Sequence, residues 1–106
     1  MNKYKNKKVM YKDMIFDSKK ERDYYIILEA LQKNGEIKDL KWQVPFELQP
    51  KFKFKGKTIR AITYIADFTY IKDGQLVIVD TKGYRTEIYK LKKKMMQYKG
   101  YDIKEV

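Results

Sequence analysis

The aspartates Asp67 and Asp80 are the residues whose types and spacing point most directly to chemistry. They flank Asp73-Gly74, a dipeptide that predicts a two-residue hairpin turn when it lies between runs rich in β-branched and aromatic residues. With that dipeptide at the centre of the turn, Lys72 faces Gln75. Counting outward from this pair places Asp67 directly opposite Asp80 on one face of the hairpin. Like charges that face each other across a ladder are destabilising, so the pair predicts a cation between them.

Lys82 lies two positions after Asp80, and the alternation of side chains along a strand places its ammonium on the same face. Hydrolysis of a phosphodiester needs positive charge near the transition state and a deprotonated water. A divalent cation on Asp67 and Asp80, with the Thr81 carbonyl as a further ligand, would supply both, and Lys82 could orient or deprotonate the water. The structural alternative is a surface ladder in which Lys82 bridges the acids, but surface ion pairs contribute too little to offset two facing aspartates.

Composition restricts the metal and the partner. The chain has no His and no Cys, which excludes thiolate zinc sites, disulfides and His-based catalysis. Oxygen ligands alone favour Mg²⁺, Mn²⁺ or Ca²⁺. With 25 Lys and Arg against 14 Asp and Glu in 106 residues, the formal net charge is +11, which favours nucleic acid first and an anionic membrane second.

No apolar stretch approaches the roughly 20 residues that a membrane span needs, and no apolar segment follows the basic start of the chain to form a signal peptide. We therefore expect no membrane insertion and a cytoplasmic location. The length fits a single domain with one core.

Hydrophobic periodicity predicts an α/β sandwich. We expect a helix from Ser18 to Lys33, a strand from Ile37 to Leu48, a basic turn or short hairpin at 51–57, paired strands at 58–71 and 75–81, a helix at about 87–98, and a last strand at 101–106. Pro45 indicates an edge position or a bulge in its strand. Apolar residues on both faces of the paired strands indicate a sheet covered on both sides.

The second helix is expected to begin after Thr86 as its N-cap. Its apolar stripe, expected to face inward, consists of Ile88, Leu91, Met95 and Tyr98. Lys90, Lys93 and Lys94 are expected to face outward. Tyr64 is expected in the core, on the face opposite to the two aspartates.

Asp67 followed by Asp80-Thr81-Lys82 resembles the signature of the PD-(D/E)XK nucleases, in which an acid on one strand is followed by acid-any-Lys on its neighbour. The chain is also similar to small phage-encoded proteins of this group, themselves similar to resolvases that cut branched DNA during phage recombination. The similar phrases are FDSKKE at 16–21, RAITYIADF at 60–68 and VDTKG at 79–83. Two departures are Ala66, where the group usually has Pro, and Asp80, where Glu is commoner.

This resemblance implies a restriction-endonuclease-like α/β core at 17–106, in the order αβββαβ, with a central mixed sheet of about four strands between two helices. Residues 1–16 would form a basic N-terminal arm. It implies a Mg²⁺- or Mn²⁺-dependent DNA endonuclease, acting on Holliday junctions or other structured DNA in the cytoplasm of a bacterial host. A homodimer is expected because cutting both strands of a junction needs two sites. The implied catalytic residues are Asp67, Asp80, Lys82 and Glu21, with Asp67, Asp80, Thr81 and Glu21 on the metal.

Glu21 keeps two interpretations open. The resemblance makes it a metal or water ligand, whereas Ser18-Lys19-Lys20-Glu21 is also a capping box in which the Glu bonds back to the start of the helix. The expected DNA contacts are Arg60, Lys53, Lys55, Lys57, Arg85, Lys90 and Lys94. Solubilising charge is the alternative for these residues. Arg60 falls on the face opposite to the aspartates, so a contact with DNA would require a bulge or a strand end.

Two other functions stay open. One is a nucleic-acid-binding module that keeps the fold without catalysis. The other is a phage protein that binds a host protein. Absence of cleavage in Mg²⁺ or Mn²⁺, with salt-dependent binding intact, would favour the binding module over the nuclease. Nucleic-acid binding too weak to measure at moderate salt would favour the protein that binds a host protein.

Overall fold

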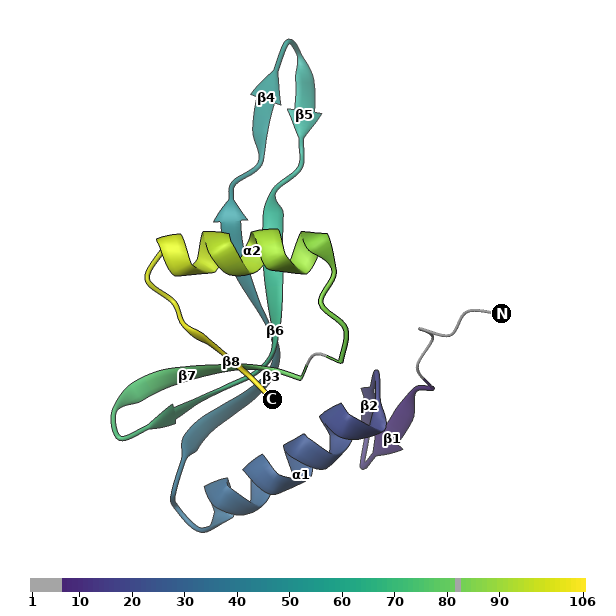
Figure 1. Cartoon of the computed structure of the whole chain (residues 1–106), viewed down its shortest axis with the longest axis vertical. Helices are drawn as coiled ribbons and strands as arrows, with labels where there is room; N and C mark the ends of the chain where they lie inside the picture. The colour runs from purple at the N-terminus through teal and green to yellow at the C-terminus, as the bar shows by residue number, and fades with distance from the viewer. Residues whose placement is uncertain (1–6, 82) are drawn as a thin grey trace.

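A four-stranded sheet in the order β3-β6-β7-β8 forms the centre of the computed structural model, which describes residues 7–81 and 83–106 (Figure 1). Strands β3 (Lys38–Gln49), β6 (Ile62–Lys72) and β7 (Gln75–Asp80) are antiparallel neighbours, and β8 (Ile103–Glu105) runs parallel to β7. Helix α1 (Lys19–Lys33) precedes β3, and helix α2 (Glu87–Tyr98) precedes β8. The predicted mixed sheet with two helices is confirmed. β3 is an edge strand, which accommodates Pro45 as predicted.

The hairpin of β6 and β7 has the predicted register. Lys72 pairs with Gln75, and the ladder continues in step to Phe68 and Val79. Asp73 and Gly74 both have positive φ, 51° and 76°, as a type I′ turn requires at its two central positions. Asp67 and Asp80 are the next positions beyond the last ladder pair.

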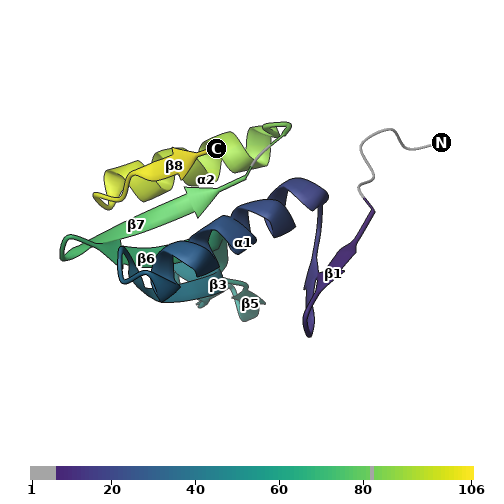
Figure 2. The same ribbon diagram turned by 90° about the horizontal axis from the view of Figure 1, so that it is seen from below.

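The two helices cover opposite faces of the sheet. Ile78 packs in a cluster with Tyr89 and Met96 of α2, whereas its strand neighbour Val79 packs in a cluster with Leu28 of α1. Because adjacent strand residues point to opposite faces, these clusters lie on opposite sides of β7. Figure 2 shows β7 between α2 and α1. The expectation of a sheet covered on both sides is confirmed.

The side chains of β6 change faces at Asp67. Tyr64 and Ala66 belong to the cluster under α2, whereas Phe68 and Tyr70 belong to the cluster under α1. Regular alternation would keep all four on one face. The alternation is therefore broken between Ala66 and Phe68, and Asp67 occupies the break.

β3 changes faces at the same level. Trp42 packs against the cluster under α1 and Phe46 against the cluster under α2. Between them Gln43 has a φ of 54°, a left-handed conformation that is uncommon for a residue other than glycine. Gln43 lies between the ladder pairs of Trp42 with Phe68 and of Val44 with Ala66, level with Asp67. We name this level of β3 and β6 the face switch.

Helix α1 begins after Ser18, as predicted, because the Ser18 hydroxyl accepts a hydrogen bond from the Glu21 backbone N–H. Helix α2 likewise begins after Thr86, whose hydroxyl accepts from the Tyr89 N–H. The local capping residues therefore predicted both starts.

The predicted inward face of α2 is wrong except at Met95. Tyr89 and Met96 are the buried residues of α2, and Met95 is partly buried, whereas Ile88, Leu91 and Tyr98 are exposed, Tyr98 to 93%. The helix is turned so that Tyr89 and Lys93 reach Glu105 of β8. These polar contacts place a different stripe of the helix against the sheet.

The predicted strand at 58–71 consists of two strands. Residues Thr58 and Ile59 belong to β5 (Lys57–Ile59), which pairs with β4 (Phe52–Phe54), and β6 begins only at Ile62. The short hairpin that was one of two expectations for 51–57 is thus confirmed. Arg60 lies between β5 and β6, at a strand end.

Part of the predicted N-terminal arm is a hairpin that packs on the domain. Strands β1 (Val9–Tyr11) and β2 (Met14–Phe16) pair with each other, and Phe16 is fully buried. The Tyr11 hydroxyl donates a hydrogen bond of 2.7 Å to Glu29 of α1. Residues 1–6 of the arm lie outside the described residues. Within the described ranges, neither helix is long and apolar enough to cross a membrane.

Candidate functional site

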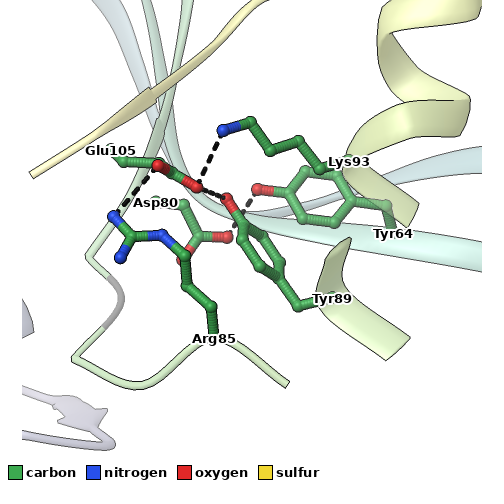
Figure 3. Close-up of polar contacts among 6 residues, drawn as sticks. All are labelled: Tyr64, Asp80, Arg85, Tyr89, Lys93 and Glu105. Carbon is green, nitrogen blue, oxygen red and sulfur yellow. Dashed lines mark hydrogen bonds and ion pairs between the residues drawn. The ribbon is translucent and has the colours of Figure 1, made fainter. Parts of the chain in front are cut away.

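Asp80 is fully buried at the end of β7. Its Oδ2 accepts a hydrogen bond of 2.6 Å from the Tyr64 hydroxyl (Figure 3). The expectation that Tyr64 lies in the core is confirmed, but its expected placement away from Asp80 is wrong. The face switch is the physical reason, because it returns Tyr64 to the side on which Asp80 points. Burial, and then the hydrogen bond to Asp80, raise the pKa of the Tyr64 hydroxyl, which therefore stays a donor.

Asp67 contacts the residue after Asp80. Its Oδ2 accepts hydrogen bonds from the Thr81 backbone N–H at 2.7 Å and from the Thr81 hydroxyl at 2.8 Å. The two aspartates thus lie at the same end of the β6–β7 hairpin, and each carboxylate has its own donors. Thr81, expected to offer its carbonyl to a metal, contributes its N–H and hydroxyl to Asp67.

Glu21 is a carboxylate that α1 buries, with 3% of the residue exposed. Its Oε1 accepts from the Asp17 backbone N–H at 3.3 Å, while its own N–H donates to Ser18. This is the reciprocal arrangement of a capping box, shifted by one residue at the Glu end. The structure therefore confirms the capping interpretation of Glu21.

Capping engages only one oxygen of Glu21. Its Oε2 is buried without a hydrogen-bond partner, and so is Nε1 of Trp42. Burial raises the pKa of Glu21 to about 7, and the charge of Asp67 also raises it, while the Asp17 N–H and the Trp42 indole act in the opposite direction. Trp42 is thus near this carboxyl without a well-formed hydrogen bond to it. The second oxygen of Glu21 is available to a ligand.

Asp67 is the electrostatic link between the acids of the site. Burial is the main cause of the raised pKa of Glu21 on one side of the sheet and of Tyr64 on the other, and the charge of Asp67 adds to both. The face switch explains how one residue can act on both sides. Lys82, one of the predicted catalytic residues, lies outside the described residues.

The donor set suits a hard cation, because Glu21, Asp67 and Asp80 offer only carboxylate oxygen. Glu21 Oε2 is a buried oxygen that lacks a protein donor. Among residues 7–81 and 83–106, no group of three or more acids is arranged to hold a metal ion. The residues fit Mg²⁺ or Mn²⁺ in their chemistry, and after burial the charge of Asp67 is the next cause of the raised pKa of Glu21.

A second polar cluster, centred on Glu105 of β8, was missed from the sequence. Its carboxylate accepts from the Tyr89 hydroxyl at 2.6 Å, and it pairs with Arg85 at 3.0 Å and Lys93 at 3.2 Å (Figure 3). Hydrogen bonds from Arg85 and Tyr89 lower the pKa of Glu105 to about 2. This cluster fastens α2 to β8. Burial and the hydrogen bond to Glu105 raise the pKa of Tyr89, and the charge of Asp80 raises it further. Only the contact across the fold identifies Tyr89 and Glu105 as partners.

The predicted DNA-contacting residues fall into two groups. Arg85 is partly committed to Glu105, and Lys90 forms an i,i+3 ion pair of 3.0 Å with Glu87 on the exposed side of α2. The others are exposed and form no salt bridge with a described residue: Lys53, Lys55, Lys57, Arg60 and Lys94. The first four of these share one protruding segment.

The Tyr64–Asp80 contact makes a stability prediction. Tyr64→Phe removes the donor to the buried Asp80 Oδ2, so we expect the free energy of unfolding to fall by about 2 kcal/mol. Urea denaturation followed by circular dichroism measures the change. Tyr70→Phe is the matched control, because the Tyr70 hydroxyl makes no hydrogen bond to a described residue. A loss no larger than that of the control would contradict a structural role for this hydrogen bond.

The comparison with known families gives one match. The family model described as "Protein of unknown function (DUF1064)" matches residues 1–106, so the chain belongs to this family. No curated protein and no solved structure matches the chain.

Proposed function

For this member of the DUF1064 family, we propose a metal-dependent endonuclease that hydrolyses phosphodiester bonds in branched or structured DNA. The observation that carries the proposal is the buried Glu21, whose pKa is raised to about 7 by burial and by the charge of Asp67. Two acids that come from separate elements and repel each other where solvent exposure is low make the folded protein less stable. A fold retains such a pair most readily when a cation binds to it.

The roles follow from the elements that hold each group. Glu21, Asp67, Asp80 and the Thr81 carbonyl would hold Mg²⁺ or Mn²⁺, which when bound acts as a Lewis acid and lowers the pKa of a bound water. Tyr64 and Thr81 orient the two aspartates through their hydroxyl groups. We assign to Lys82 the orientation or deprotonation of the attacking water, or the neutralisation of charge that develops on the phosphate.

The substrate class rests on charge. The formal net charge of +11 favours a polyanion, and the exposed Lys53, Lys55, Lys57 and Arg60 offer phosphate contacts away from the acids. We further propose that the protein acts as a homodimer, because a junction must be cut on two strands. A phage-encoded resolvase would meet this DNA in the cytoplasm of its bacterial host during recombination or replication.

The proposal predicts metal-dependent cleavage of a synthetic four-way junction. We expect nicked products in Mg²⁺ or Mn²⁺, none in EDTA, and slower cleavage of linear duplexes with the same arm sequences. Denaturing gel electrophoresis of end-labelled strands measures the products. Cleavage that persists in EDTA would contradict a role for the metal.

A binding module without catalysis is the second candidate. It is favoured by the protein donors that already engage Asp67 Oδ2 and Asp80 Oδ2, and by the lack of a three-acid metal group among the described residues. Junction binding that weakens with salt, without cleavage in Mg²⁺ or Mn²⁺, would support it. Undetectable binding at moderate salt would instead support the hypothesis of a host-protein partner.

A further inference from the structure

Residues 50–60 form a protruding hairpin that we call the β4–β5 arm. Its strands pair with each other and form no ladder with the central sheet. Every residue of the arm is exposed. Figure 1 shows the arm projecting past α2, beyond the ends of β3 and β6.

The arm has an apolar side. Phe52 pairs with Ile59, and Phe54 pairs with Lys57, so both aromatic rings point to the same side of the hairpin. The exposed fractions are 42% for Phe52 and 59% for Phe54. An isolated two-stranded hairpin is marginally stable, and its apolar residues would gain most from burial against a core. These two rings extend into solvent instead, which marks them for contact with a partner.

The charge of the arm identifies the chemistry of that partner. Between Pro50 and Arg60 the chain has five basic residues and no acidic one: Lys51, Lys53, Lys55, Lys57 and Arg60. The turn itself carries one of them, since Lys55 and Gly56 have φ values of 50° and 78°, those of a type I′ turn. The Lys55 ammonium lies 5.6 Å from the centre of the Phe54 ring. Cations thus surround the exposed rings.

A partner that suits this surface is polyanionic and also offers flat apolar faces. Nucleic acid with unpaired bases has both properties, because its phosphates meet the Lys residues and its bases can stack on aromatic rings. In a continuous duplex, the faces of the bases are hidden by their neighbours, and a ring reaches them only by separating a base step. A branch point or a single strand exposes those faces without that cost.

We propose that the β4–β5 arm binds nucleic acid at unpaired bases, with Phe52 and Phe54 stacking on the bases and the surrounding Lys residues on the phosphates. This inference rests on the proposed function and gives it a substrate preference, namely DNA whose base stacking is interrupted. The acids of the site would then carry out cleavage, and the arm would determine which DNA structures are bound.

The test is metal-free binding of the full chain, measured by fluorescence anisotropy in EDTA. The DNA ligands are a junction with unpaired bases at its centre and a duplex of equal length. With Phe52→Leu/Phe54→Leu, which keeps apolar side chains on the arm, we expect affinity for the junction to fall roughly tenfold to a hundredfold. Affinity for the duplex should change by less than about threefold, with an unchanged salt slope. Equal loss on both ligands would overturn the proposal.

Two further variants make the test specific. Phe54→Trp should retain junction binding, and its indole fluorescence, measured against wild type to subtract Trp42, should be quenched by the junction more than by the duplex. Leu76→Ala, which alters an exposed apolar residue at the far end of β7, should leave both affinities unchanged. Absence of selective quenching would overturn the assignment of stacking to Phe54.

Sedimentation velocity tests the competing explanation that the rings join two copies of the chain. If wild type is an oligomer and the Phe52→Leu/Phe54→Leu substitutions dissociate it, the arm is an assembly surface and the proposal fails.

Failure of the arm proposal can be distinguished from failure of the proposed nuclease activity. Selective binding without cleavage in Mg²⁺ supports the arm and contradicts catalysis, whereas cleavage with unaltered selectivity in the Phe variant does the reverse.

Discussion

Asp80→Asn is expected to lower the rate of junction cleavage by about a hundredfold or more while leaving DNA affinity within about threefold of wild type. The amide is nearly isosteric with the carboxylate and can still accept the hydrogen bond from Tyr64. It lacks the negative charge that makes a carboxylate a stronger ligand for a divalent cation than a neutral amide. In the proposed function, DNA affinity would depend mainly on exposed basic residues, which this change does not touch. Single-turnover cleavage and metal-free anisotropy measure the two quantities.

Asp73→Asn is the matched control for this experiment. It makes the same chemical change in the same hairpin, at the exposed turn, where Asn tolerates the left-handed φ of 51°. Cleavage by this variant should equal that of wild type. If Asp80→Asn cleaved the junction at the wild-type rate, the assignment of Asp80 and with it the proposed site would be refuted.

The parts of this fold with local determinants could be predicted from the sequence. Asp73-Gly74 set the turn and register of the β6–β7 hairpin, because few other dipeptides adopt positive φ at both positions easily. Ser18 and Thr86 marked the starts of both helices, because their hydroxyl groups satisfy backbone N–H groups that the helix leaves free. Each of these features depends on residues within a few positions of each other.

The face of α2 could not be predicted, because its sequence has two apolar stripes. The stripe of Ile88, Leu91 and Tyr98 is the more hydrophobic, yet the stripe of Tyr89 and Met96 faces the sheet. Which stripe faces the sheet depends on the hydrogen bond of Tyr89 and the ion pair of Lys93 with Glu105. Glu105 lies in β8, the strand that follows α2. Periodicity within a helix contains no information about such a partner.

The face switch explains why the candidate site was predicted only in part. The turn and the alternation of side chains placed Asp67 directly opposite Asp80 on one face of the hairpin. In the structure the ladder ends one position earlier, at Phe68 and Val79, and Asp67 contacts Thr81 instead. Alternation also separated Tyr64 from Asp80, which the structure brings into contact. At the same level, β3 has the left-handed Gln43, whose sequence context contains neither a glycine nor a turn motif that would have revealed the irregularity.

The raised pKa of Glu21 predicts that the protein becomes less stable as the pH rises through about 7. Burial and the charge of Asp67 raise this pKa from 4.5 to about 7, so the folded state binds the proton more tightly than the unfolded state. The stabilisation by this proton is complete below pH 4.5 and is lost as the pH rises through the folded value. The loss amounts to about 3 kcal/mol above that range. Glu105, whose pKa is lowered to about 2, acts in the separate window below pH 4.5.

Glu21→Gln should remove this pH dependence and still accept the capping hydrogen bond from Asp17. Urea denaturation should show a variant more stable than wild type by about 3 kcal/mol near pH 8.5 and nearly equal to it near pH 4.5. Glu36→Gln, at an exposed carboxyl, should match wild type throughout. Equal pH profiles for wild type and Glu21→Gln would contradict the raised pKa. If the Glu21 carboxylate is a metal ligand as well as a cap, added Mg²⁺ should stabilise wild type near pH 8.5 and should not stabilise Glu21→Gln. The reason is that only the ionised carboxylate both repels Asp67 and attracts a cation.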